Sequence, residues 1–154
     1  MSFKNLGGGS HLVIKKNKYP KVNTVALDKF IKKKNNIGYV KIDVEGAEFR
    51  VIEGLKKIIS ISRQLVQVEL SYSFLKRFQN SITDVFNFFD KHKYCFIRKK
   101  ISKKFVLYEK SKQIYLNSIY KNTKSSSDFI FIPKEKMSKI KLCKKIKFNK
   151  LFYS

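Results

Sequence analysis

Residues 39–98 show apolar patterns that change between the period of a strand and the period of a helix. Three short runs are rich in β-branched and aromatic residues, which is typical of strands. Two longer runs between them repeat apolar residues every three to four positions, as amphipathic helices do. This alternating order indicates an α/β fold with a parallel sheet. The expected strands cover 39–44, 64–70 and 93–99, and the expected helices cover 46–59 and 81–92.

Both expected helices have a defined apolar face. The stripe of the first consists of Val51, Leu55, Ile58 and Ile59. The second opens at Ser81 with Asp84 three residues later, a variant of the capping box that marks a helix start. Its core face consists of Val85, Phe88 and Phe89.

The flanking segments are less regular. Residues 22–26 alternate as in a short strand, and a brief helix follows with Leu27, Phe30 and Ile31 on one side. "DFIFIPK" (128–134) predicts a late strand. The tail after it mixes Lys with Ile, Leu and Phe, a pattern compatible with a basic amphipathic helix.

Length and cysteine content bound the class of protein. A chain of 154 residues suits one domain with a real core. It has no apolar run long enough to span a bilayer, and its first residues lack the pattern of a secretory signal. Cys95 and Cys143 are far apart, and no His, Cys or carboxylate spacing suggests a metal site. We therefore expect a reduced, cytoplasmic protein without a metal.

The formal charge of +24 has two interpretations. It is compatible with a basic, non-enzymatic protein that binds nucleic acid or an anionic membrane, in which the tail would lie on the bilayer surface. However, arginine occurs only four times among the 35 basic residues, and abundant Lys, Asn, Ile, Phe and Tyr are what an AT-rich genome encodes. Recognition surfaces favour arginine, because its planar fork binds phosphate bidentately. We favour the genome-bias interpretation and expect no specific nucleic-acid partner.

The acidic residues are concentrated in one place. Four of the eleven lie within "YVKIDVEGAEFRVIEG" (39–54). Asp43 ends an expected strand, Glu45 lies in the turn after it, and Glu69 ends the next strand. Ligands of open α/β sheets bind beyond such strand ends. The alternative is that Asp43 or Glu45 only caps the following helix, while Glu48 fits the positive end of the helix dipole.

"VKIDVEGAEFRVIEGLKKI", preceded by "NTVALDKFI" and followed by "QLVQVELS" and a late "FIFIPK", resembles the signature of the FkbM-type methyltransferases. The same motifs occur in that family in the same order. The resemblance implies a Rossmann-like, three-layer fold that uses S-adenosylmethionine. It also implies methyl transfer to a hydroxyl of a sugar, glycan or related small molecule.

The resemblance assigns roles to individual residues. It implies that Asp43 or Glu45 orients or deprotonates the acceptor, and that Gly46 lies close to the cofactor. Glu69 and Asp28 are expected to contact the acceptor or brace the site. Lys41 lies on the same strand face as Asp43, so we expect either an ion pair between them or a solvent-exposed lysine.

One part of such an enzyme has no counterpart in the sequence. Only 21 residues precede "VNTVALD", and "LGGGSHL" among them lacks the strand and acid that flank a cofactor-binding turn. We expect a partial methyltransferase domain at 1–133, its C-terminal part, and a basic tail at 134–154. The chain would be an inactive truncated form, a half completed by another polypeptide, or a repurposed half-domain. Without the earlier strands, strand 39–43 would be an unprotected sheet edge, and we expect that the chain alone does not bind S-adenosylmethionine tightly.

Overall fold

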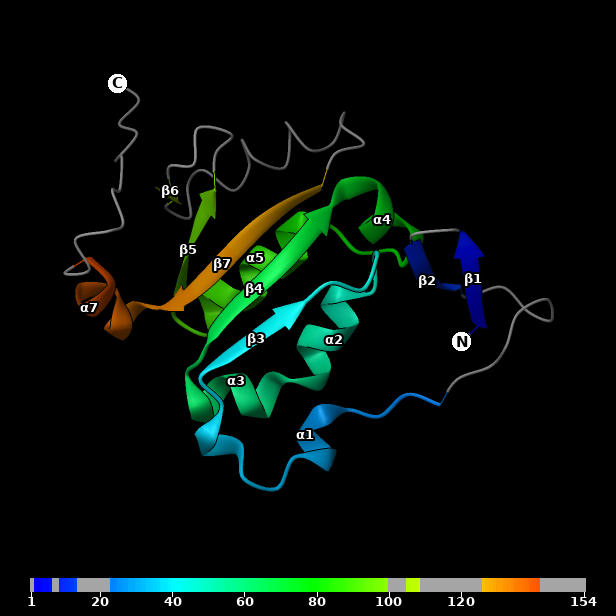
Figure 1. Ribbon diagram of the computed structural model, residues 1–154. Helices are drawn as coiled ribbons and strands as arrows, with labels where there is room; N and C mark the ends of the chain where they lie inside the picture. Colours follow the sequence, from blue (N-terminus) through cyan, green and yellow to red (C-terminus); the bar gives the residue numbers. More distant parts are fainter. Residues whose placement is uncertain (1, 7–8, 14–22, 100–104, 109–125, 142–154) are drawn as a thin grey trace.

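The computed structural model describes residues 2–6, 9–13, 23–99, 105–108 and 126–141, and its centre is a five-stranded sheet (Figure 1). The spatial order of the strands is β3-β4-β7-β5-β6. Their bounds are β3 (Tyr39–Ile42), β4 (Leu65–Ser71), β5 (Tyr94–Lys99), β6 (Phe105–Tyr108) and β7 (Ser126–Pro133). The chain is therefore an α/β protein, as expected.

The sheet is mixed, so the prediction of a parallel sheet is wrong in part. β3 and β4 are parallel, with Tyr39 opposite Leu65. β7 is antiparallel to both β4 and β5 and separates them. In this central place its core-facing side chains Phe129 and Phe131 are almost completely buried.

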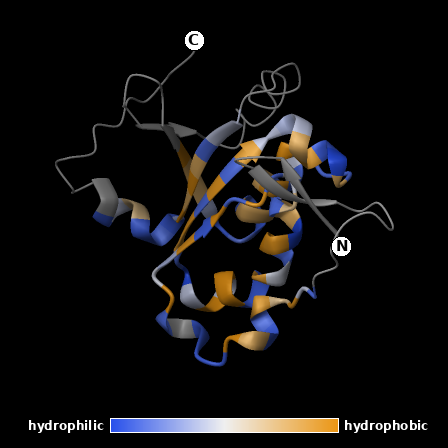
Figure 2. Ribbon diagram, turned by 45° about the vertical axis from the view of Figure 1, so that its right-hand side comes forward, coloured by the Kyte–Doolittle hydropathy of each residue, from blue (hydrophilic) through white to orange (hydrophobic). Residues whose placement is uncertain are grey.

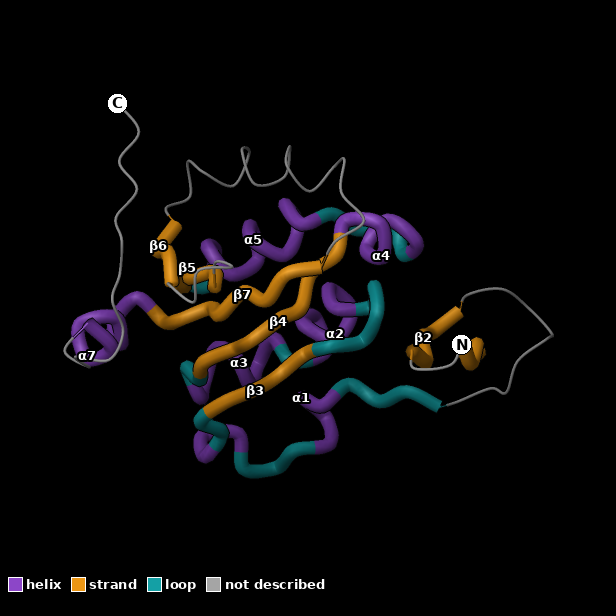
Figure 3. The backbone as a smooth tube through the Cα atoms, turned by 45° about the horizontal axis from the view of Figure 1, so that its top comes forward, coloured by secondary structure: helices purple, strands orange, loops and turns teal. Residues whose placement is uncertain are grey.

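Helices cover one face of the sheet (Figures 1 and 3). They are α2 (Glu48–Gly54), α3 (Lys56–Ser62) and α5 (Ile82–Lys91). Aromatic rings fill the space between the layers: Phe86 stacks on Phe96 with 4.6 Å between ring centroids, and Phe89 stacks on Phe131 at 3.8 Å. Figure 2 shows hydrophobic residues along the strands and on the helices packed against them.

The opposite face of the sheet is open over β3 and β4 in the described residues. Exposed or half-exposed polar side chains lie there, among them Tyr39, Lys41 and Gln67. Only the far end is covered, where Met137 packs on Ile97 and Ile132. A three-layer arrangement is thus not seen in the part of the chain that the structure describes. A face made of polar side chains needs no covering layer.

The expected helix 46–59 is two helices that meet at Leu55. Asp28, from α1 (Leu27–Phe30), accepts hydrogen bonds from the backbone amides of Lys57 at 2.7 Å and Ile58 at 2.9 Å. In a continuous helix those amides would bond to carbonyls one turn earlier. Because a carboxylate from a distant segment binds both amides, α2 ends at Gly54 and a new helix, α3, begins at Lys56.

Several sequence predictions hold and others do not. α5 has the complete capping box between Ser81 and Asp84, as predicted. Residues 23–26 are not a strand. α1 itself has no buried residue, and of its expected apolar face only Ile31, directly after the helix, packs against the core. α4 (Tyr72–Arg77) was not predicted.

The two ends of the chain differ from the sequence predictions. β1 (Ser2–Leu6) and β2 (Gly9–Val13) pair antiparallel, with Leu6 opposite Gly9, where no strands were expected. After β7 the chain forms two short helices, η3 (Lys134–Lys136) and α7 (Met137–Lys141). The predicted tail helix otherwise lies outside the described residues. No helix in the described ranges is long and apolar enough to cross a membrane.

Candidate functional site

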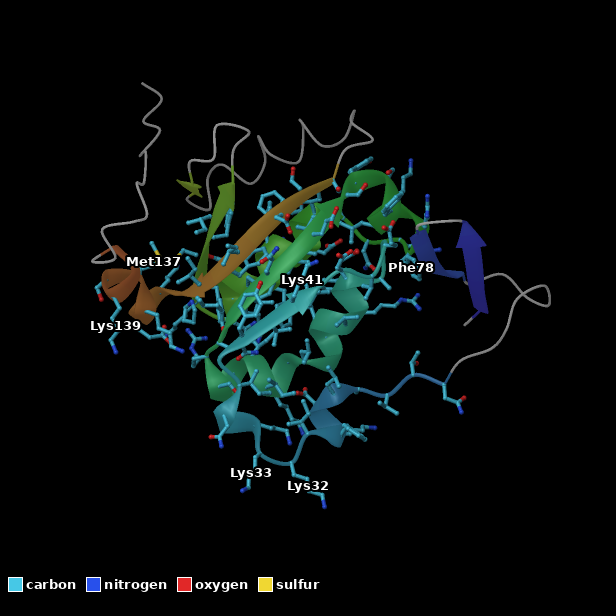
Figure 4. All side chains as sticks on the ribbon, in the orientation of Figure 1. Lys32, Lys33, Lys41, Phe78, Met137 and Lys139 are labelled. Atoms are coloured by element: carbon cyan, nitrogen blue, oxygen red, sulfur yellow. The ribbon has the colours of Figure 1, made fainter. Side chains whose placement is uncertain are left out.

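Asp43 directly follows β3 and carries the predicted ion pair. Its Oδ2 lies 2.9 Å from Lys41 Nζ, and both side chains are substantially exposed on the open face of the sheet (Figure 4). The hydrogen bond and the charge of Asp43 raise the pKa of Lys41. Lys41 is therefore both solvent-exposed and paired, which combines the two alternatives stated from the sequence.

The turn after Asp43 has an unusual backbone. Glu45 has a φ of 53° and Gly46 a φ of 114°. Left-handed conformations are costly for residues with a side chain, and the value at Gly46 favours glycine. A Cβ at Gly46 would lie 2.4 Å from the carbonyl oxygen of Phe74 in α4. The turn therefore packs directly against the backbone of α4.

Glu48 anchors the same turn from inside the protein. Its side chain is 3% exposed, and Oε1 accepts a hydrogen bond of 2.8 Å from the Gly46 amide. Oε2 is buried without a hydrogen-bond partner among the described residues. Burial raises the pKa of the Glu48 carboxyl. Glu48 does lie in the first turn of α2, but its burial was not foreseen from the sequence.

The alternative that Asp43 or Glu45 caps α2 is not supported. α2 follows Ala47 without a side-chain cap, and the carboxylate that reaches this end of the helix belongs to Glu48. Asp43 instead pairs with Lys41. The two candidate carboxylates are therefore not needed to begin the helix.

Glu69 lies near the end of β4 in a polar network that the sequence did not reveal. Asp128 of β7 stands opposite Glu69 in the register of the sheet. Ser126 donates a hydrogen bond to Glu69, and Gln67 Nε2 donates one of 2.8 Å to Asp128. Each carboxylate thus has a donor, which offsets the repulsion expected between like charges on paired strands.

This network extends to the edge strand. The Tyr39 hydroxyl donates to Gln67 Oε1, and the charges of Asp128 and Glu69 add to the effect of Asp43 in raising the pKa of Lys41. The alternation in "SSDFIFIP" places Asp128 opposite the buried phenylalanines. Only the strand order, however, brings Asp128 beside Glu69.

Asp28 does not join these carboxylates. Both of its oxygens bind amides at the start of α3, and Figure 1 shows α1 beside α3, away from the end of β3. This contact explains an acid at that position without a ligand. Its expected contribution to an acceptor site stays a prediction.

The closeness of Gly46 to a cofactor stays a prediction. Its amide is bonded to Glu48, and the space a side chain would occupy is filled by Phe74. The described residues hold no group of three or more His, Cys, Asp or Glu side chains placed to bind a metal ion.

The chain belongs to the FkbM methyltransferase domain family. The family model, described as methyltransferase FkbM domain, matches residues 2–96, more than half of the chain. Membership indicates a methyltransferase at the level of the family, and such domains use S-adenosylmethionine. The match includes β3, the Glu45–Gly46 turn and β4, whereas β7 lies beyond it. No curated protein and no solved structure matches the chain.

Proposed function

We propose that the chain provides the acceptor-binding edge of a Rossmann-like, S-adenosylmethionine-dependent O-methyltransferase. Its substrate would be a hydroxyl group of a sugar, a glycan or a related metabolite. The observation that carries the proposal is the position of Asp43 and Glu45 at the carboxyl end of β3, inside the family match. Ligands of open α/β sheets bind at such ends.

Asp43 is our candidate for handling the acceptor proton. A hydroxyl oxygen that takes a methyl group loses its proton, and a positioned carboxylate can orient the hydroxyl and accept that proton. Lys41 occupies Oδ2 of Asp43, so we assign Oδ1 to the acceptor hydroxyl. Glu45, displayed by its left-handed backbone, is the second candidate for contact with the acceptor.

The methyl donor is implied by the family. Gly46 does not by itself indicate where the donor binds, because it packs against Phe74 and its amide is bonded to Glu48. We therefore expect weak binding of S-adenosylmethionine by the chain alone. Titration calorimetry tests this expectation, and a dissociation constant in the micromolar range or tighter would contradict it.

The proposed reaction is tested by transfer of labelled methyl from S-adenosylmethionine, at high donor concentration, to a panel of methyl glycosides and oligosaccharides. We expect label on an acceptor oxygen and a loss of about 100-fold or more in rate for Asp43→Asn, the usual size of a general-base effect. Glu53→Gln, an exposed acid on α2, serves as the control. Equal rates for the wild type and Asp43→Asn would show that Asp43 has no part in the reaction. Absence of label over the whole panel would contradict the enzymatic proposal.

A further inference from the structure

The edge of the sheet at β3 differs from the rest of the described surface. β3 pairs only with β4, so its other side presents backbone groups without a strand partner in the described residues. Unpaired edges are templates for addition of another strand. The polar network described above lies on the face of the sheet and not along this edge.

Exposed apolar side chains occur in the segment that includes α1 and β3. The large apolar residues that are exposed in the described chain all fall between positions 25 and 61: Val25, Leu27, Phe30, Tyr39 and Ile61. Phe30 is 73% exposed and Val25 69%. Figures 1 and 3 both place α1 on the side of β3 that faces away from β4. We call Val25, Leu27 and Phe30, with the free side of β3, the β3 edge surface.

α1 buries little of its own surface against the rest of the described structure. It has four residues, none of them buried, and it is held to the core side by the Asp28 carboxylate and by the half-buried Ile31 that ends it. The exposed phenylalanine of this short helix contributes little to the stability of the isolated protein, because its ring stays in contact with water. Clustered exposed apolar groups mark interaction sites.

The charges beside this surface indicate the kind of partner. Lys29, Lys32 and Lys33 are exposed on and after α1. Figure 4 shows Lys32 and Lys33 on the loop after α1 and Lys41 on β3. Asp28 is the only acid between residues 23 and 42, and it is bound to α3. A second copy of the chain would oppose these lysines with its own and carries the same net charge of +24. An acidic partner is complementary where a second copy is repelled.

We propose that the β3 edge surface binds an extended, acidic segment of another polypeptide, which adds a strand to β3. Backbone hydrogen bonds to β3 would provide register. Apolar side chains on one face of the segment would cover Val25, Leu27 and Phe30, and acidic residues would meet the lysines. This inference does not depend on methyl transfer.

The test uses the full chain and a short synthetic peptide in which Val alternates with Glu. We expect saturable binding by fluorescence anisotropy. We also expect slower hydrogen exchange at those amides of Tyr39–Ile42 that face away from β4. A peptide of the same composition in scrambled order, and one with Lys in place of Glu, should bind about tenfold more weakly or worse, because the first lacks an apolar face and the second has the wrong charge.

Matched variants separate the surface from general charge attraction. Lys32→Glu with Lys33→Glu should weaken binding. Lys91→Glu with Lys139→Glu makes the same change in net charge at exposed positions on α5 and α7 and should weaken it less. Phe30→Ser, at a position where no core contact is lost, should also weaken binding.

Three results would overturn the proposal. Equal binding of the alternating and scrambled peptides would show charge attraction without strand addition. Peptide binding without protection of β3 amides would place the contact elsewhere. Sedimentation showing a dimer that Phe30→Ser dissociates, with β3 amides protected only in the dimer, would make a second copy the occupant.

Discussion

At the scale of single residues, the geometry beyond β3 depends on the Glu45–Gly46 turn. Gly46 combines a positive φ with a contact that leaves no space for a side chain. Glu48 reaches back to its amide from a buried position. The motif "DVEGAE" therefore contains one residue required by the backbone, one buried anchor, and two further acids, the exposed Asp43 and the half-buried Glu45.

Gly46→Ala should destabilise the protein by about 2 kcal/mol or more, because the methyl group meets the Phe74 carbonyl and alanine disfavours this φ. Gly38→Ala is the matched control, since a Cβ there has no neighbour within 4 Å. It should change the free energy of unfolding by less than about 1 kcal/mol. Urea denaturation measures both. A similar loss in the two variants would contradict the assigned role of Gly46.

Glu48→Gln should change how stability depends on pH. The raised pKa of Glu48 means that the folded state binds its proton more tightly than the unfolded state does. The protonated carboxyl therefore favours folding at low pH. That contribution is lost as pH rises from the unfolded value through the raised folded pKa.

We expect the variant to gain stability relative to wild type as pH rises from 4 to 7, with a slope of at most about 1.4 kcal/mol per pH unit. Chemical denaturation at each pH measures this difference. A difference that stays constant over the range would show that Glu48 does not titrate between the two states.

At the scale of elements, the break between α2 and α3 shows a distant residue overriding a local pattern. The apolar stripe through Leu55, Ile58 and Ile59 is buried as predicted. The stripe is nevertheless divided between two helices, because Asp28 binds two amides just after Leu55. Asp28 thus acts as a cap supplied by another element.

Asp28→Ala should lower the free energy of unfolding by about 1 kcal/mol, the usual effect of removing a helix cap. It should also speed hydrogen exchange at the amides of Lys57 and Ile58. Glu53→Ala removes an exposed acid on the neighbouring helix and should have little effect. Unchanged exchange at both amides in Asp28→Ala would contradict the capping role.

At the scale of the whole molecule, Arg63 connects elements far apart in the chain. Its guanidinium binds Glu135 of η3 at 2.7 and 2.8 Å and the carbonyl of His92 at 2.6 Å. It also lies over the ring of Tyr94, 4.6 Å from the centroid. The end of α3 is thereby joined to β5 and to the segment after β7.

Glu135→Gln should reduce the loss of stability in acid. Hydrogen bonds from Arg63 lower the pKa of Glu135 to about 2, below its ordinary value. Its contribution is therefore present above the unfolded pKa and is lost as pH falls toward 2. Because Glu135 is half exposed, we expect an effect of no more than about 1 kcal/mol. Thermal unfolding between pH 2 and 5 measures it, with Glu53→Gln as control. Identical pH profiles of wild type and Glu135→Gln would contradict it.

Local sequence patterns determined much of the fold. β4, β5, β7 and α5 are where periodicity and the Ser81–Asp84 capping box predicted them, because these signals depend on neighbouring residues. The motif around Asp43 and Glu45 determined the family in the same way. The ion pair of Lys41 with Asp43 followed from their spacing on one strand.

Only the tertiary structure decided the features that depend on contacts between distant segments. These are the insertion of β7 between β4 and β5, the restart of the helix by Asp28, and the burial of Glu48 under the turn. It also placed Asp128 beside Glu69 and gathered exposed apolar side chains near the edge at β3. Periodicity records which face of an element is apolar, but strand order and cross-chain hydrogen bonds are set by the packing of the entire core.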